Sequence, residues 1–466
     1  MRGCFLVLSA LIGLASVPGA RAQAHGAAVV PAAGPAAFEA AFAAAQSQDA
    51  EYRGARFELE SREQNRPLAR SGLLPNVAAT YSESRVRGER VSPNALGQDF
   101  TQVLDYRNPV GALQLRQPLF NLDAALRYRS ALVQIDGARA VFTARGQELL
   151  DRLGSAYLQR LFAEEVVALA QAQVQLLQAQ TESAEQRFVR GEGTRTEVAD
   201  VKASLALAQV QAIEAMDQRD LADRALARVT GGGPLPLRSL AEDKLWLPLP
   251  ADGVQAWIDL ALAHSPSLEA RRLQLESARQ EVQRARAAHL PRVDLVASAI
   301  DARNDTLSTL NQRARQYSAG VQITVPIFSG GAVEASVKQA RADADRTEAD
   351  FDNDRAQLVL DVRRQYQAVH SGRLKVDALN EALVASSIGL EGARRGLAAG
   401  LRTPADVLDA VRRVFQSRRD LAQARTESLL ARLRLQTLSG MAPAEIVADM
   451  DRHLSGPLLL PSETPR

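Results

Sequence analysis

Two stretches with alternating apolar and polar residues interrupt a chain whose hydrophobic pattern is otherwise helical. In the first stretch Val77, Ala79 and Tyr81 alternate with small or polar neighbours, which is the two-residue period of a half-buried strand. Residues 87–108 are polar with Gly and Pro and predict a long loop before a return strand. A second alternating stretch occupies residues 290–328. The pattern therefore predicts two β-hairpins, or four strands.

Helical periodicity fills the rest of the chain. Residues 38–72 read as helix, and apolar residues recur at helical spacing between residues 121 and 190, which contain no proline. A continuous helix there would be about 105 Å long at about 1.5 Å per residue, so it requires coiled-coil partners. Residues 191–196 interrupt this helix and residues 197–230 predict another.

The same order of elements occurs twice. Residues 45–77 align with residues 261–293 without a gap, and Gly191 has its counterpart in Gly400. Each half therefore reads as helix, hairpin, long helix, glycine break and shorter helix. The predicted segments are a leader (1–22), a first repeat (23–230), a proline-rich insert (231–256), a second repeat (257–440) and a tail without a strong pattern (441–466).

Four prolines mark the junctions between helix and strand. Pro75 and Pro291 stand where a helix ends and a strand begins, and Pro118 and Pro326 stand where a strand ends and a helix begins. Proline suits both places, because it lacks the backbone donor that a strand ladder needs and its fixed φ favours a helix start.

The first 22 residues have the features of a secretory signal: Arg2, an apolar run over residues 5–17, and a small residue on each side of Arg21. The only cysteine, Cys4, lies within this leader, so the mature chain has no thiol or disulfide chemistry. Removing the leader takes away Arg2 and Arg21, and the formal net charge falls from +2 to zero. That balance argues against a nucleic-acid partner.

Catalytic chemistry is not indicated by the sequence. The five histidines are scattered, without an acid or a second histidine at ligand spacing, and the glycines at 231–233 lack the Lys-Ser/Thr of a phosphate loop. We therefore predict no enzyme activity, no metal and no cofactor. After residue 30 there is no apolar run of membrane-spanning length, so any membrane insertion must use the strands. Four strands are fewer than the roughly eight of a small barrel, which implies several chains, and three would supply twelve.

The ordered set of these features, with the sequences TRTEVADVKASL after the first glycine break and LRTPADVLDAVRRVF after the second, resembles the TolC family of outer-membrane channel-tunnels. The resemblance implies an α+β, mostly α fold, in which three chains form a coiled-coil tunnel and a membrane β-barrel of four strands from each chain. It implies a homotrimer that contacts outer-membrane lipid, extends into the periplasm, and meets a periplasmic adaptor and an inner-membrane ABC transporter.

The GEGTRTEV form is most similar to family members that serve type I secretion. That branch exports an unfolded protein cargo, of which an RTX-type toxin is one example. The alternative within the family is the outer-membrane channel of a small-molecule efflux pump. A third reading, a periplasmic adaptor or structural rod, fits less well because the predicted strands form paired hairpins at the ends of the coils.

The resemblance also assigns roles to the glycine breaks and the residues after them. Gly191 and Gly400 become the turns at the periplasmic tip. The residues that it places in a periplasmic gate are Arg402, Asp406 and Asp409, with Glu197 and Asp200 as their counterparts in the first half. Six aspartates around the mouth of a trimer would raise one another's pKa and attract cations.

Each of these acids also has a simpler explanation than a role in the gate. Thr403 and Pro404 form a good helix start in which Asp406 is the third helical residue, and Thr194 with Glu197 has the same capping pattern. Asp409 also fits a solvated helix face. A tyrosine found in some gates of the family is Leu397 here, so the closing network must differ in detail.

Overall fold

The computed structural model describes residues 37–93, 97–233, 235, 237–241, 248–249, 253–306, 309–454 and 458–459. The predicted leader and its cleavage site lie outside these residues, as do parts of the proline-rich insert and of the tail. The fold is mostly helical with antiparallel strands, as the sequence predicts. Within the described part of the chain, no helix is both long and apolar enough to span a membrane.

The elements of the first half are α1 (Ala37–Gln48), α2 (Ala50–Glu63), α3 (Asn65–Ser71), β1 (Asn76–Pro93), β2 (Asp99–Phe120), α4 (Leu122–Val189) and α5 (Arg195–Thr230). A short β3 (Leu237–Arg238) follows. The second half contains α6 (Val254–His264), α7 (Pro266–Ala287), β4 (Arg292–Thr306), β5 (Thr309–Thr324), α8 (Ala332–Ala398) and α9 (Pro404–Leu438). The chain continues with α10 (Pro443–His453) and β6 (Leu458–Leu459).

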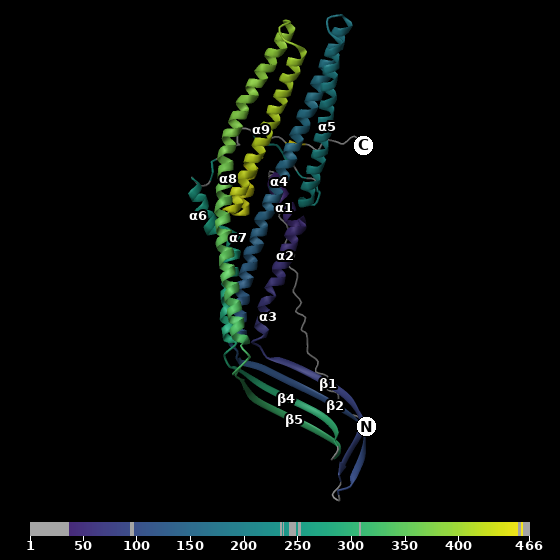
Figure 1. Cartoon of the computed structure of the whole chain (residues 1–466), viewed down its shortest axis with the longest axis vertical. Coiled ribbons are helices and arrows are strands. Elements are labelled where there is room, and N and C mark those ends of the chain that lie inside the picture. Colours follow the sequence, from purple (N-terminus) through teal and green to yellow (C-terminus); the bar gives the residue numbers. More distant parts are fainter. Residues whose placement is uncertain are drawn as a thin grey trace, which may run out of the picture. The chain divides into compact units, whose positions relative to one another are not determined.

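The predicted internal repeat is confirmed by the lengths of matching helices. The long helices α4 and α8 have 68 and 67 residues, and the shorter helices α5 and α9 have 36 and 35. In each half a strand hairpin lies at the start of the long helix and a helix–helix turn lies at its far end (Figure 1). The two ends of the long helices therefore present different surfaces.

The helix predicted over residues 38–72 is instead three helices, and its first break has a clear cause. Asp49 ends α1 and caps α2, because its carboxylate accepts the Tyr52 amide hydrogen at 2.7 Å. The same carboxylate pairs with Arg152 of α4 at 2.9 Å and is buried. Capping therefore fixes the break, and the ion pair with Arg152 attaches it to the long helix.

The four long strands form one antiparallel sheet in the order β1-β2-β4-β5. The loop predicted over residues 87–108 is wrong, because β1 and β2 stay paired up to Pro93 and Asp99. Charged side chains in this stretch recur every second residue and pair across the strands: Arg85 bonds Asp105 at 2.8 Å, and Arg107 lies 3.8 Å from Glu83. Polar composition suggested a loop, whereas the period of the charges is that of a strand.

A dense apolar core joins α1, α4, α5, α9 and α10 near the middle of the long helices. The largest buried side chains in this core include Phe38 and Tyr157, whose rings meet edge to face at 5.5 Å. At Gly154 the helices α4 and α9 approach closely, since a methyl group there would lie 2.1 Å from a methyl carbon of Leu433. Helix α10, which supplies Ile446 and Met450 to this core, was not expected from the sequence.

Candidate functional site

The two helix–helix turns have the same backbone structure. Gly191 and Gly400 adopt φ values of +77° and +71°, which favour glycine. Their amides donate to Phe188 and Leu397, each at 3.0 Å, and the next amide in each turn bonds the carbonyl five residues back at 2.9 and 2.8 Å. The repeated pattern satisfies the last carbonyls of α4 and α8 and reverses the chain within the five residues between the helices.

Asp406 forms a capping box at the start of α9. Its side chain accepts the Thr403 amide hydrogen at 2.8 Å, and the Thr403 hydroxyl accepts the Asp406 amide hydrogen at 3.2 Å. The hydrogen bond from the Thr403 backbone is the main reason that the pKa of Asp406 lies below its ordinary value, with a smaller contribution from Arg402, 3.9 Å away. Within one chain, Asp406 is therefore a well-satisfied carboxylate.

Asp409 lies one turn farther along α9 and has a different partner. It pairs with Arg412, and both side chains remain about half-exposed or more. Arg402 packs its aliphatic part over Gly396 at the end of α8, where a methyl group would lie 2.6 Å from Cγ of Arg402. The structure thus brings Arg402 to Asp406 and leaves Asp409 to Arg412.

The corresponding residues of the first half are less engaged. The Thr194 hydroxyl accepts the Glu197 amide hydrogen at 3.2 Å, so Thr194 caps α5. Asp200 is exposed on the next turn of the same helix. Glu197 and Asp406 therefore occupy the same position, three residues after the capping threonine of their helix. Asp406 makes more hydrogen bonds with its threonine than Glu197 does.

The junction prolines lie at the ends of the strands. Pro75 and Pro291 immediately precede β1 and β4. Pro118 lies within β2, where the register with β4 shifts before Phe120. Pro326 follows the end of β5 by two residues.

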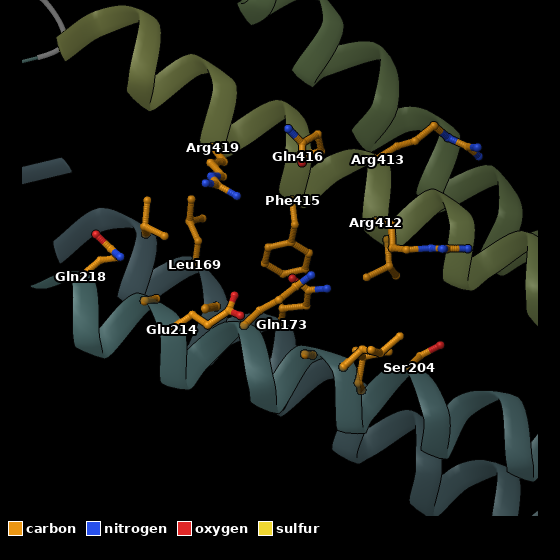
Figure 2. A pocket seen from close by; sticks show the side chains of 18 of the residues that line it. Leu169, Gln173, Ser204, Glu214, Gln218, Arg412, Arg413, Phe415, Gln416 and Arg419 are labelled. Carbon is orange, nitrogen blue, oxygen red and sulfur yellow. The ribbon is translucent and has the colours of Figure 1, made fainter. Parts of the chain in front are cut away.

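A groove of about 1140 Å³ separates the α4–α5 hairpin from α9, and the sequence analysis did not anticipate it. Figure 2 shows Phe415 of α9 pointing toward Gln173 of α4 and Glu214 of α5. The groove is lined by apolar residues together with glutamines and arginines, among them Gln159, Leu169, Gln211, Gln218, Arg412, Gln416 and Arg419. Glutamines at helical spacing on α4 and α5 are the signal that sequence reasoning passed over.

Apolar contact between the two helical hairpins is uneven along their length. In the described part of the chain, Leu408 of α9 joins an apolar cluster with Leu177 of α4 and Val201 of α5 near the turns. Toward the middle of the helices, α4, α5 and α9 share the much larger core around Leu153 and Leu433. The ends of the hairpins are therefore held to each other less firmly than their bases.

No three His, Cys, Asp or Glu side chains come close enough to hold a metal ion anywhere in the described ranges. The arrangement at the turns consists of caps, ion pairs between exposed side chains and a groove. What it offers chemically is a set of exposed, paired charges next to the turns between the helices.

Comparison with known proteins places these features in a family. The family described as outer membrane efflux protein matches residues 41–232 and 257–441, one segment for each half. The alkaline protease secretion protein AprF of Pseudomonas aeruginosa is 34% identical over 410 residues, covering 87% of this chain and 85% of the relative. The proteases secretion protein PrtF of Dickeya chrysanthemi is 31% identical over 398 residues, with 84% and 85% coverage.

Solved structures show the same fold. The outer membrane protein VceC from Vibrio cholerae superimposes with a TM-score of 0.72 at 18% identity, covering 87% of this chain and 96% of that one.

Proposed function

The chain belongs to the outer membrane efflux protein family, also known as the TolC family, and we propose that it is the outer-membrane channel of a type I secretion system. It carries an unfolded protein across the periplasm and the outer membrane. An inner-membrane ABC transporter supplies the cargo and the energy, and a periplasmic adaptor joins the two. The channel itself performs no chemical step.

The observation that carries this proposal is the similarity to two protease secretion proteins. Both are more than 30% identical to this chain, and each alignment covers at least 84% of this chain and of the relative. A match of that extent includes the strands, the long helices and both turns, so it is not confined to the core that any member of the fold needs.

The sheet supports an assembly of several chains. Its outer strands β1 and β5 each have one edge without a strand partner in the described part of the chain. Free edges of strands this long pair with other strands. In the proposed trimer, β1 of one copy pairs with β5 of the next, and the twelve strands close a barrel.

We place the gate at the helix–helix turns. The contact of Leu408 with α4 and α5 holds the α8–α9 hairpin near the α4–α5 hairpin in the closed state. Arg402, Asp406 and Asp409 line the mouth in this proposal, with Glu197 and Asp200 on the neighbouring hairpin. When a partner pulls on α9, only a few apolar contacts break at the tip. The large core at the base keeps the hairpin attached.

A clean deletion of the gene, followed on one strain by two measurements, tests the proposal. Mass spectrometry of the culture medium should show the loss of one or a few large proteins. Susceptibility to a panel of dyes, detergents and antibiotics should stay within twofold of the parent, and a plasmid copy should restore secretion.

The family also contains efflux channels, as its description states, so small-molecule efflux is the second candidate. Normal secretion with broad hypersensitivity in the deletion strain would contradict the secretion channel and establish the efflux channel instead.

A further inference from the structure

The register of the four-stranded sheet sorts its side chains onto two faces. Residues that are directly opposite in an antiparallel pair lie on the same face, and each strand alternates between faces. Val77 is opposite Leu115, Leu115 is opposite Ala297, and Ala297 is opposite Ala319. Odd-numbered residues of all four strands therefore share one face, and even-numbered residues share the other.

The odd face begins, next to the helices, as an apolar surface. Apart from Gln117, its side chains there are Val77, Ala79, Leu113, Leu115, Val293, Leu295, Ala297, Ala299, Ala319, Val321 and Ile323. In β4 this run from Val293 to Ala299 covers about 20 Å along the strand at about 3.3 Å per residue. That length approaches the roughly 25 Å apolar band of a membrane barrel.

A tyrosine marks the outer limit of the apolar surface in each hairpin. Tyr81 is 71% exposed and Tyr317 is 79% exposed, and both lie on the odd face. Beyond Tyr81, the next odd residues of β1 are Glu83 and Arg85, and beyond Tyr317, going toward the turn, the next of β5 is Arg315. Tyrosine at such a boundary is typical of the interface between hydrocarbon and headgroups.

Beyond the tyrosines, pairs of arginines share single carboxylates. Asp105 lies 2.8 Å from Arg85 and 3.5 Å from Arg87, so one carboxylate serves two guanidinium groups. The second hairpin repeats the arrangement, with Asp301 between Arg313 and Arg315. A single carboxylate compensates one positive charge, so each group of three retains an excess charge and unused donors.

Two more arginines on the odd face extend this surface. Arg107 lies 3.8 Å from Glu83, and Arg303 is exposed in the same part of β4. We call the six arginines the arginine girdle: Arg85, Arg87, Arg107, Arg303, Arg313 and Arg315. The odd-numbered acids of the four strands are Glu83, Glu89, Asp99, Asp105, Asp301 and Asp305, equal in number to these arginines. The excess of positive charge is therefore local to the two groups of three around Asp105 and Asp301.

On the even face, the part of the sheet next to the helices carries polar side chains. Ser298 and Ser318 share a hydrogen bond at 2.8 Å, and Thr80, Gln114 and Gln316 lie on the same face. In β2 the even residues Gln102 to Asn108 are half-buried, while the odd residues between them are exposed. The even face is therefore the more enclosed one, which suits the inside of a closed sheet and leaves the odd face for the surroundings.

We propose that the arginine girdle binds the phosphate groups of phosphorylated lipid in the membrane leaflet that faces away from the periplasm. This proposal rests on the proposed function, which places the strands in the outer membrane with the helices on the periplasmic side. Arginine forks hold phosphate oxygens with two parallel hydrogen bonds, and the apolar surface beside them accepts the acyl chains of the same lipid.

Titration of the detergent-solubilised full-length protein with diphosphoryl lipid A, followed by native mass spectrometry, tests the girdle. The variant Arg85→Gln/Arg87→Gln/Arg313→Gln/Arg315→Gln should bind lipid A at least fivefold more weakly than the parent. A matched control, Arg62→Gln/Arg224→Gln/Arg346→Gln/Arg364→Gln, removes the same charge from exposed helix surfaces. It should bind as the parent does.

A second variant changes binding in the opposite direction and guards against a folding defect in the first. Asp105→Asn/Asp301→Asn frees the arginines from their carboxylates and should bind lipid A at least twofold more tightly. Inorganic phosphate at the same phosphate concentration should leave the lipid bound. Equal lipid binding by the girdle and control variants, no gain in the double variant, or displacement by inorganic phosphate would each overturn the proposal.

Flotation with phosphatidylcholine vesicles separates this proposal from the proposed function. Insertion into neutral vesicles requires the apolar surface and not the arginines. A parent protein that fails to float would count against the membrane role itself. If the parent floats and all variants bind lipid A equally, only the proposed lipid binding by the arginine girdle is overturned.

Discussion

At the scale of single residues, the most consequential polar contact is the buried pair that attaches α10 to α9. Arg432 and Asp449 have side chains 6% and 4% exposed, with two hydrogen bonds at 2.7 and 3.1 Å. Gln436 donates to the same carboxylate at 2.7 Å. Burial alone would raise the pKa of Asp449, but the bonds and charge of Arg432 outweigh burial and lower it. The carboxylate is therefore ionised at neutral pH.

Replacing this carboxylate should be costly and pH-dependent. Asp449→Asn removes the negative charge that faces the buried Arg432 guanidinium, so we expect a loss of about 3–5 kcal/mol at pH 7. Because the folded pKa lies below the unfolded value of about 3.9, the stabilisation is present above that value and disappears as the pH falls through the folded pKa. Guanidinium unfolding followed by helical circular dichroism at pH 7 and pH 3 measures both effects.

Asp361→Asn is the control, since its pair with Arg364 on α8 lies at the surface. It should change the free energy of unfolding by less than about 1 kcal/mol at either pH. A loss for Asp449→Asn that is the same at pH 7 and pH 3 would contradict the role given to the ionised carboxylate.

At the scale of elements, the long helices and the repeat follow from the sequence because proline is absent and the same pattern occurs twice. The length of the first strand hairpin was missed, since Arg85, Asp105 and their neighbours look like a polar loop until the register pairs them. Helix α10 was missed for a related reason. Its apolar residues Ile446 and Met450 stand in a short, proline-rich tail, and only packing against α9 shows that they form a core face.

The candidate site was predictable only in part. Glycine breaks and capping patterns identified the turns, because they depend on local backbone geometry. The partner of Asp409 and the groove beside Phe415 depend on how α9 lies against α4 and α5, which no short-range pattern encodes. Contacts between distant helices are the part of a site that one sequence leaves undetermined.

The helical tips supply a direct test of the gate. Leu408→Ser removes the apolar contact of α9 with α4 and α5, and large-to-small changes in buried sites cost about 2–5 kcal/mol. We expect the closed state to weaken, so that conductance in a planar lipid bilayer rises several-fold over the parent channel.

The matched control is Leu421→Ser on the same helix. Leu421 is equally buried but packs against Val376 of α8 within its own hairpin. This control should lose stability without a comparable rise in conductance. Equal conductance in the two variants would show that the contact of Leu408 does not hold the gate.

At the scale of the whole molecule, apolar side chains remain exposed where a neighbouring copy is proposed. On α5 they include Leu207, Val210, Ile213 and Leu221, and on α8 they include Leu360, Leu374, Val384 and Ile388. Together with the free edges of β1 and β5, they give each chain two different surfaces for association. A head-to-tail contact between two such surfaces closes into a ring when the rotation per copy is correct.

The number of copies is the measurement that tests this account most directly. Native mass spectrometry of the mature protein, released intact from detergent micelles, gives that number without a shape assumption. The account predicts a particle of three chains that survives high salt, because strand pairing and apolar contact hold it together. A stable monomer or dimer under the same conditions would contradict the proposed channel, since four or eight strands would then have to account for the whole barrel.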